Sequence, residues 1–257
     1  MSLLELPDPP DWRRSRGVGY VLVLLSVVVA GVYCVLGAVA AFHGRYLTTV
    51  VSVGWAVFLL LLALGAALVM SGRMTPQIVC DRTGFTLRPD LRFSKLILAG
   101  LLATIPSTLL FVVFAPMGAI DFATTRALQV FWPIFAALAL VTVITGLTRT
   151  WRRGDVGHVT LTPAMVENAD VMSTKLFEWD DIVEVSGRAE SMRAHRAVVL
   201  RLRNGEEAVI GNANVYVPGG AVLYWMVRHY WKHPEDRDEL VDERALQRFH
   251  QRKYDVS

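Results

Sequence analysis

Four long apolar segments occupy most of the first half of the chain. They cover residues 18–42, 47–70, 96–114 and 127–147, and none of them contains Asp, Glu, Lys or Arg. A helix of about 20 apolar residues is long enough to cross a bilayer. The pattern therefore predicts an α-helical membrane bundle of four transmembrane helices, and the short link at residues 43–46 predicts that the first two are antiparallel.

The charged stretch between the second and third segments, residues 73–95, has the pattern of a β-hairpin. Two short apolar runs, residues 78–80 and 85–87, flank Gly84, which can take the positive φ that a tight reversal demands. An isolated hairpin is only marginally stable in water. We therefore expect it to join a sheet formed by the C-terminal half of the chain.

From residue 155 onward, short runs with strand-like alternation are separated by turn residues. Asn204-Gly205 has the composition of a type I′ hairpin turn. After Pro218, an apolar run over residues 221–231 has helical spacing. Residues 155–232 therefore predict a small antiparallel β domain capped by one helix, with Trp179 as an anchor of its core.

Basic residues fall mainly on one side of the predicted bundle, which identifies that side as the cytoplasm and places both termini there. Residues 1–17 form a cytosolic tail in this interpretation, with Trp12 in the headgroup layer. A cleaved export signal is the alternative, but residues 18–42 are longer than the apolar core of a signal. The basic side carries Arg13, Arg14, Arg16, Arg73, Arg82, Arg88, Arg92, Lys95, Arg149, Arg152 and Arg153, against Arg45 and Arg126 on the other side.

Composition agrees with a membrane location, because 53% of the residues are hydrophobic. A formal net charge of +3 does not indicate nucleic acid as a partner, since the arginines lie mostly beside the spans. Cys34 and Cys80 are predicted to be free thiols in a reducing compartment. Abundant Arg, Val and Ala are typical of a bacterium with a GC-rich genome.

The strand-rich run, the element over residues 177–182, the Asn204-Gly205 hairpin and the closing helix together resemble the bacterial PH-like domains attached to membrane spans. The resemblance covers residues 155–232 and implies a noncatalytic cytosolic domain that docks proteins or membrane surfaces. Members that bind phosphoinositides use basic residues between their first two strands. Residues 162–165 are short and uncharged here, so lipid-head binding is not carried over.

Two surfaces are candidates for contact with a membrane or a partner. Arginines gather around residues 188–203, where they either face anionic lipid or form a solvated sheet face. Residues 233–257 predict a charged C-terminal helix whose apolar side packs either on its own domain or on a partner helix. The arginines are Arg188, Arg193, Arg196, Arg201 and Arg203, and the apolar side carries Leu240, Val241, Leu246 and Phe249.

No catalytic, cofactor or metal site is predicted. His229 and His233 are four residues apart, but no third ligand is near in the sequence, so solvated helix histidines are preferred to a metal site. The acidic residues 178–184 alternate in direction on a strand and do not converge. Gly219-Gly220 lacks the lysine and the spacing of a phosphate-binding loop.

These observations predict a noncatalytic protein of the cytoplasmic (inner) membrane. Its PH-like domain would serve as an interaction or scaffolding module, within an accessory subunit of a membrane assembly. The expected partners are the lipid bilayer and either other membrane proteins or further copies of the chain. A transporter or channel component is the alternative, with Thr104, Ser107 and Thr108 beside Pro106 lining the route, and an enzyme acting on lipid-soluble substrates is the third hypothesis.

Overall fold

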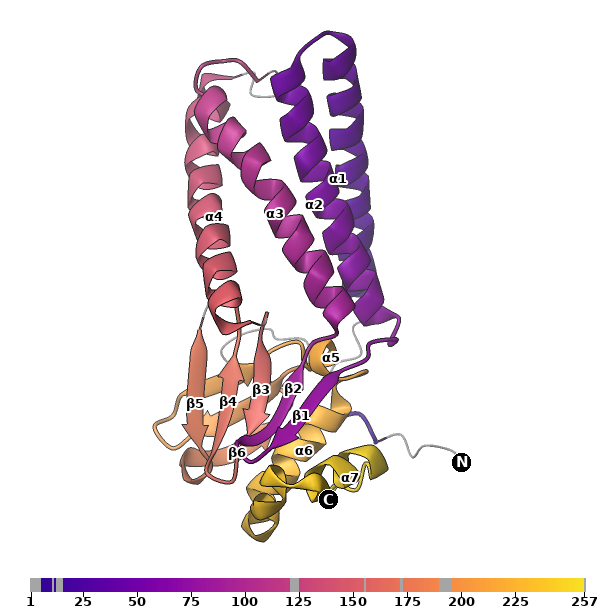
Figure 1. Ribbon diagram of the computed structural model, residues 1–257, viewed down its shortest axis with the longest axis vertical. Coiled ribbons are helices and arrows are strands. Elements are labelled where there is room, and N and C mark those ends of the chain that lie inside the picture. Colours follow the sequence, from indigo (N-terminus) through magenta and orange to yellow (C-terminus); the bar gives the residue numbers. More distant parts are fainter. Residues whose placement is uncertain are drawn as a thin grey trace. The chain divides into compact units, whose positions relative to one another are not determined.

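The computed structural model describes residues 6–10, 12, 16–120, 125–154, 156–171, 173–189 and 196–256. The chain folds into two compact units (Figure 1). The helical unit comprises Arg16–Met70 and Arg92–Gly154, and the β unit comprises Met1–Ser15, Ser71–Leu91 and Asp155–Ser257. The β unit is thus assembled from three separate stretches of the chain.

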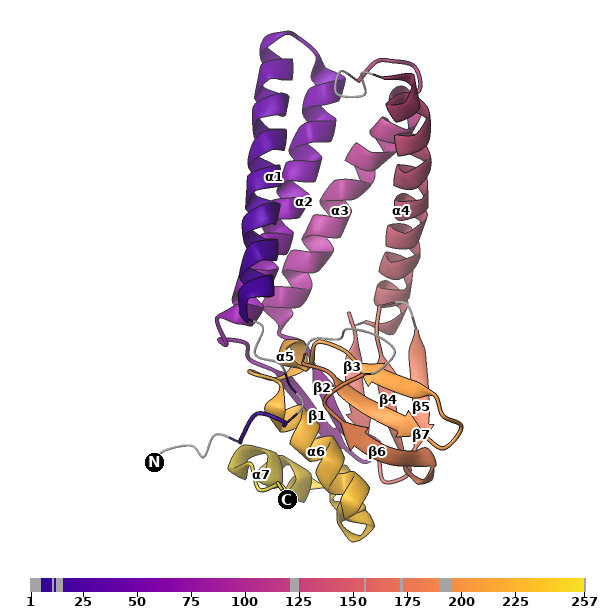
Figure 2. The ribbon, with the colours of Figure 1, turned by 180° about the vertical axis from the view of Figure 1, so that it is seen from behind.

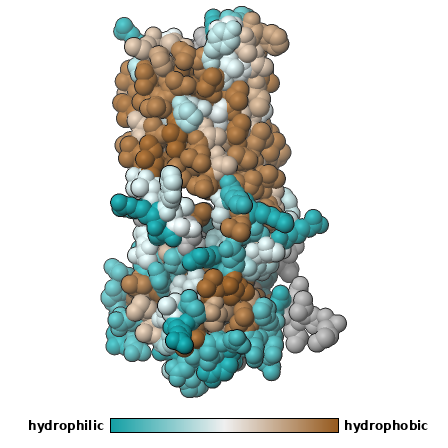
Figure 3. Space-filling view, viewed as in Figure 1, coloured by the Kyte–Doolittle hydropathy of each residue, from teal (hydrophilic) through white to brown (hydrophobic). Residues whose placement is uncertain are grey.

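All four predicted transmembrane segments are helices, and each is long and apolar enough to cross a membrane. Figure 3 shows hydrophobic residues covering these helices in that view. Apolar surface of this extent is unusual on a soluble monomer, and the chain is a multi-pass membrane protein with a separate β region. The helices are α1 (Arg16–Phe42), α2 (Tyr46–Met70), α3 (Leu91–Phe114) and α4 (Arg126–Arg153).

Helix α4 continues past its predicted apolar segment because its termination signals lie further along. Thr125 caps the N-terminus by accepting a hydrogen bond from the Leu128 N–H. Gly154, with φ of 77°, ends the helix in the left-handed conformation and donates its N–H to the Thr150 carbonyl at 2.9 Å. Helix α3 likewise begins before residue 96, at Leu91.

The β unit contains two antiparallel sheets. The first has five strands in the order β1-β2-β3-β4-β5, and the second has three in the order β6-β7-β8. Both orders follow the chain, and neighbouring strands are antiparallel, although α3 and α4 intervene between β2 and β3. The strands of the first sheet are β1 (Gln77–Asp81), β2 (Gly84–Arg88), β3 (His158–Leu161), β4 (Met165–Ala169) and β5 (Thr174–Glu178). Those of the second are β6 (Ile182–Ser186), β7 (Val198–Leu202) and β8 (Glu207–Ile210).

The predicted hairpin is present as β1 and β2, and it joins the sheet of the C-terminal half as expected. Strand β2 pairs with β3, with Phe85 opposite Leu161 and Leu87 opposite Val159. On the other face of this pair, the hydroxyl oxygens of Thr86 and Thr160 lie 2.9 Å apart. The loop between α2 and α3 therefore supplies two strands to a domain whose other strands begin after α4.

One apolar core lies between the two sheets and helix α6 (Ala221–Lys232). Figures 1 and 2, from opposite sides, show the sheets as two layers with α6 beside them. A short helix, α5 (Ala213–Tyr216), precedes α6. Trp179, in the 3-10 turn η1 (Trp179–Asp181), is the predicted core anchor. It is 2% exposed, and its indole Nε1 donates to the Thr162 carbonyl at 2.8 Å.

The structure differs from the prediction at the C-terminus. Residues 233–257 do not form one helix but a 3-10 segment, η2 (Pro234–Val241), followed by α7 (Glu243–Gln251). The break falls at Asp242, whose carboxylate accepts the Arg244 N–H at 2.8 Å and so caps α7. Both pieces belong to the β unit, which therefore extends beyond residues 155–232.

The structure also shows contacts of Trp12 that the sequence did not predict. Its side chain is half-buried against the core of the β unit, and its Nε1 donates to the Ala197 carbonyl at 3.0 Å. Its predicted place in a headgroup layer stays a prediction. Arg13 and Arg14, predicted at the membrane face, lie outside the described residues.

Candidate interaction surfaces

The arginine patch predicted from the sequence is divided among different neighbours. Arg201, on the central strand β7, lies between Glu184 of β6 and Glu207 of β8. Its Nη1 is 3.1 Å from the Glu184 Oε2, and its Nε is 3.9 Å from the Glu207 Oε1. Two carboxylates thus lie beside the positive charge of Arg201 within the sheet. They weaken the attraction of this arginine to an anionic membrane.

The other arginines of the patch point elsewhere. Arg203 donates from Nη2 to the Asp180 carbonyl at 2.9 Å, and Arg196 donates from Nη1 to the Gly219 carbonyl at 3.1 Å. Arg188 is exposed, and Arg193 lies outside the described residues. Arg201, Arg203 and Arg196 therefore hold together parts of the β unit, and contact with a membrane or partner stays a prediction.

The apolar side predicted for a partner helix is covered by the chain itself. Leu240 is fully buried and Phe249 nearly so, with Leu246 packed against the same core. The rings of Phe249 and Phe85 have centroids 5.6 Å apart, which joins α7 to the β1–β2 hairpin. Val241 is half-buried. Of the two interpretations, the structure shows packing on the chain's own domain.

Cys80, on β1, takes part in the same contact. Its Sγ lies 3.0 Å from the Asp242 carbonyl, at the start of α7. Burial, followed by the charges of Asp242, Asp81 and Glu243, raises the pKa of this thiol. Both cysteines are free thiols, and the raised pKa disfavours the reactive thiolate form of Cys80.

His229 was predicted to be solvated, and this is wrong, because only 5% of the residue is exposed. Its Nδ1 accepts the Asp255 N–H at 3.4 Å, which leaves Nε2 to donate to Asp236 at 3.0 Å. His233 contacts Glu235 and Asp255 at a more open position. Within the described ranges, no group of three or more His, Cys, Asp or Glu side chains could hold a metal ion.

We expect the stability of the β unit to depend on pH between about 7 and 5. Burial, and then Arg248, lowers the pKa of His229 despite its bond to Asp236. The stability that His229 contributes is therefore lost as pH falls below the ordinary histidine pKa of about 6.5. The hydrogen bond to Glu235 raises the pKa of His233, whose contribution is present in acid and lost as pH rises. Thermal unfolding of His233→Gln should therefore show a steeper loss of stability in acid than the wild type.

The matched variant His229→Gln removes the other histidine and should flatten the same profile. The groups around His229 are Asp236, Asp255 and His233, with Arg248 and Tyr254 from the C-terminal segment. Carboxylates titrate mainly below this pH range. Identical slopes in both variants would show that these histidines do not set the pH dependence.

The acidic residues near Trp179 do not converge on a site. Glu184 pairs with Arg201, whereas the Asp180 side chain points to solvent with Arg237 3.9 Å away. Gly219 and Gly220 have φ of 76° and 79° and lead into α6, where the left-handed backbone requires glycine. These acidic residues and glycines thus take part in turns and in strand pairing.

The hydroxyl side chains beside Pro106 are buried between α3 and α2. Ser107 donates from Oγ to the Val50 carbonyl at 3.3 Å, and the Trp55 Nε1 donates to the Thr108 Oγ1 at 3.2 Å. Gly54 allows the close approach, because a Cβ added there would lie 2.6 Å from the Ser107 Cβ. The polar groups thus act in helix packing, as small and hydroxyl residues commonly do in membranes.

Replacing Gly54 with alanine should therefore loosen the packing of α3 on α2. Overpacking of this kind costs about 1–3 kcal/mol. Thermal unfolding of the detergent-purified protein would measure it, and Ser107→Gly in the same chain should restore part of the loss. Gly31→Ala is the matched control, since a Cβ there meets nothing within 4 Å. Equal effects at positions 54 and 31 would contradict the proposed contact.

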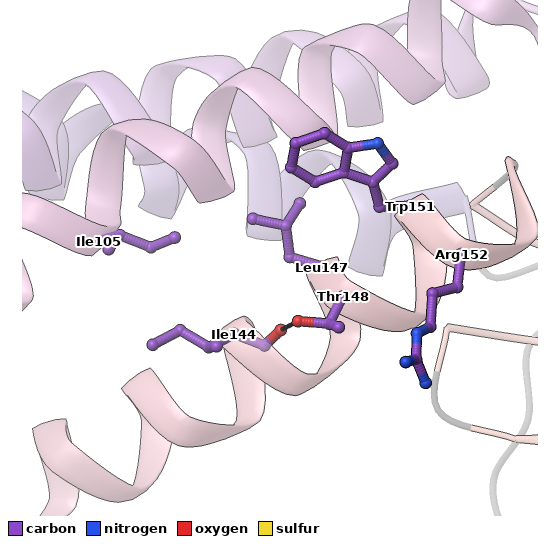
Figure 4. Close-up of a pocket in the computed structure, with 6 residues that line it drawn as sticks. All are labelled: Ile105, Ile144, Leu147, Thr148, Trp151 and Arg152. Atoms are coloured by element: carbon purple, nitrogen blue, oxygen red, sulfur yellow. Dashed lines mark hydrogen bonds between the residues drawn. The ribbon is translucent and has the colours of Figure 1, made fainter.

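A cleft of about 310 Å³ lies between α3 and α4 (Figure 4). Ile105, Ile144 and Leu147 give it apolar walls, and Trp151 and Arg152 stand toward one end. Trp151 is 85% exposed, so the cleft opens to the surroundings. The lining suits a hydrocarbon chain such as that of a neighbouring lipid.

The structure reveals one surface that the sequence did not predict, which we call the Trp12 groove. A Cβ at Gly187 would lie 2.6 Å from the Trp12 Cδ1, and one at Gly220 would lie 3.0 Å from its Cη2, so the indole fits between two glycines. Tyr224 meets the ring edge-on at 6.3 Å. The prolines beside Trp12 were the available signal for this surface in the sequence. The sequence did not indicate which residues would contact the indole.

Comparisons of the chain with models of protein families, with curated proteins and with solved structures gave no match.

Proposed function

We propose that this chain is a noncatalytic protein of the cytoplasmic (inner) membrane whose β unit is an interaction or scaffolding module, within an accessory subunit of a membrane assembly. The observation that carries the proposal is the pairing of β2 with β3. This pairing joins the β1–β2 hairpin, which lies between two membrane helices, to the C-terminal half of the chain in one β unit. A module built in this way is fixed to its membrane anchor at several points of the chain.

The arrangement of the β unit supports a PH-like domain. A five-stranded and a three-stranded antiparallel sheet share a core that α6 closes, and domains of this kind dock other molecules. The turn between β3 and β4 carries no charge, and Thr162 closes it by exchanging hydrogen bonds with Met165. Protein partners, or further copies of the chain, therefore fit the module better than phosphorylated lipid heads.

The connectivity supports a cytoplasmic location for the β unit and both termini. The chain passes between its units before α1, after α2, before α3 and after α4. In a bundle whose consecutive helices alternate in direction, these four ends share one side of the membrane. That side carries most of the arginines beside the spans, which is typical of the cytoplasm.

The alternative of a transporter or channel component depended on Thr104, Ser107 and Thr108. All three are buried, and Ser107 and Thr108 bond to α2. Their contacts are those of helix packing, so they do not favour a conducting route.

Site-specific photo-crosslinking in native membranes tests the proposal. A photoreactive residue at Leu176 or Val183, both exposed on the β unit, should give defined crosslinks to protein. The same residue at Leu138, exposed on α4, is the control and should react mainly with lipid. If the two β-unit positions give no more protein crosslinks than Leu138, the proposal of an interaction module fails.

A further inference from the structure

Residues 6–10 and Trp12 lie against the β unit as a separate segment, which we call the strap. The Trp225 Nε1, on α6, donates to the Pro7 carbonyl at 2.8 Å. At the other end, the Trp12 Nε1 donates to the Ala197 carbonyl, just before β7, at 3.0 Å. Figure 2 shows the indigo segment beside α6. The strap is thus held by indole hydrogen bonds at both ends.

The strap has the composition of a peptide ligand. Pro7, Pro9 and Pro10 fix the backbone φ at three positions, and the Trp12 N–H donates to the Pro9 carbonyl at 3.0 Å, which closes a turn at the tryptophan end. A segment whose backbone is already restricted loses less conformational entropy when it binds. Proline-rich segments are recognised by grooves lined with aromatic side chains, and Tyr224 and Trp225 line this groove with their rings 5.0 Å apart.

The position of Trp12 selects for an indole. Gly187 and Gly220 leave room for a flat ring, because a Cβ at either glycine would come within 3.0 Å of it. The Ala197 carbonyl accepts the indole N–H, and the Arg196 guanidinium lies 6.0 Å from the ring centroid. A phenyl ring would fill part of the space but could not donate to Ala197.

We propose that the Trp12 groove is a recognition site for proline-rich segments that end in tryptophan. The strap is its ligand within the same chain, and a partner protein that carries such a segment binds when the strap leaves. This inference rests on the proposed function, since it names the partner of the interaction module. A ligand tethered within one chain competes at an effective concentration in the millimolar range, so the strap keeps the groove closed to weak ligands.

A synthetic, fluorescein-labelled peptide of residues 4–14 tests the inference on the full chain in nanodiscs. The variant W12A empties the groove and should bind the peptide saturably, at least tenfold more tightly than the wild type. A peptide with alanine in place of its tryptophan should not bind. Adding Gly187→Ala to W12A should abolish binding, since the added Cβ occupies the place of the indole.

The wild-type chain provides a second measurement that does not depend on the folding of W12A. With 5-fluorotryptophan incorporated and the Trp12 resonance assigned from W12F, millimolar peptide should shift this ¹⁹F signal toward that of a solvent-exposed indole. The absence of both saturable binding to W12A and a shift in the wild type would overturn the inference. Protein crosslinks at Leu176 and Val183 would then still support the interaction module, so the two failures are distinguishable.

Discussion

Replacing Trp179 with alanine is expected to unfold the β unit and to leave the four membrane helices intact. The side chain is almost completely buried, its Nε1 donates to the Thr162 carbonyl, and the Arg237 guanidinium lies 5.1 Å from its ring centroid. Loss of a buried tryptophan or phenylalanine side chain costs about 3–5 kcal/mol. Small domains have a total stability of only about 5–15 kcal/mol.

Hydrogen exchange of the purified protein would measure this effect, with faster exchange expected in β3 to β8 and unchanged exchange in α1 to α4. Trp179→Phe keeps a ring and removes the N–H, so it should have a smaller effect. Trp132→Ala is the matched control, because this tryptophan is 56% exposed on α4. If Trp179→Ala and Trp132→Ala behave alike, Trp179 does not anchor the core.

Replacing Phe85 with alanine should have the second large effect, at a cost of about 3–5 kcal/mol. Phe85 is fully buried, pairs with Leu161 across the β2–β3 boundary and contacts Phe249 of α7. The substitution removes a contact shared by three separate parts of the chain. Peptides from β1–β2, β3 and α7 should therefore all exchange faster.

Val79→Ala is the control for Phe85→Ala, since Val79 lies in the same hairpin and is 41% exposed. It should change exchange little anywhere. Faster exchange confined to the hairpin after Phe85→Ala would show that the hairpin and the C-terminal half are energetically independent.

The sequence was sufficient to predict the membrane helices and most of the local β structure. Uncharged apolar segments identified the spans, because length and hydrophobicity alone decide whether a helix can cross a bilayer. The turn residues Gly84 and Gly205 marked two hairpins, and both glycines take positive φ, of 144° and 83°. The marginal stability of an isolated hairpin correctly indicated that β1 and β2 join another sheet.

Contacts between distant parts of the chain could not be predicted in the same way. His229 is buried partly by Tyr254 and by the segment that carries Arg248, which follow it only after the break at Asp242. The acidic run before that break contains several residues that could cap a helix. The sequence pattern therefore did not identify Asp242 as the residue that caps α7. Trp12 has the flanking residues of an interface anchor, and its actual acceptor, Ala197, is 185 positions away.

Disulfide formation across β2 and β3 tests most directly whether the hairpin and the C-terminal half form one sheet. Thr86 and Thr160 are directly opposite, and their hydroxyls are 2.9 Å apart. In a chain with Cys34→Ser and Cys80→Ser, the pair Thr86→Cys and Thr160→Cys should form a disulfide within one molecule, detected by mass spectrometry of unreduced peptides. Val79→Cys with Thr160→Cys should form none, because Val79 lies one strand further away, opposite Thr86. A disulfide in the control pair, or none between positions 86 and 160, would contradict the shared sheet.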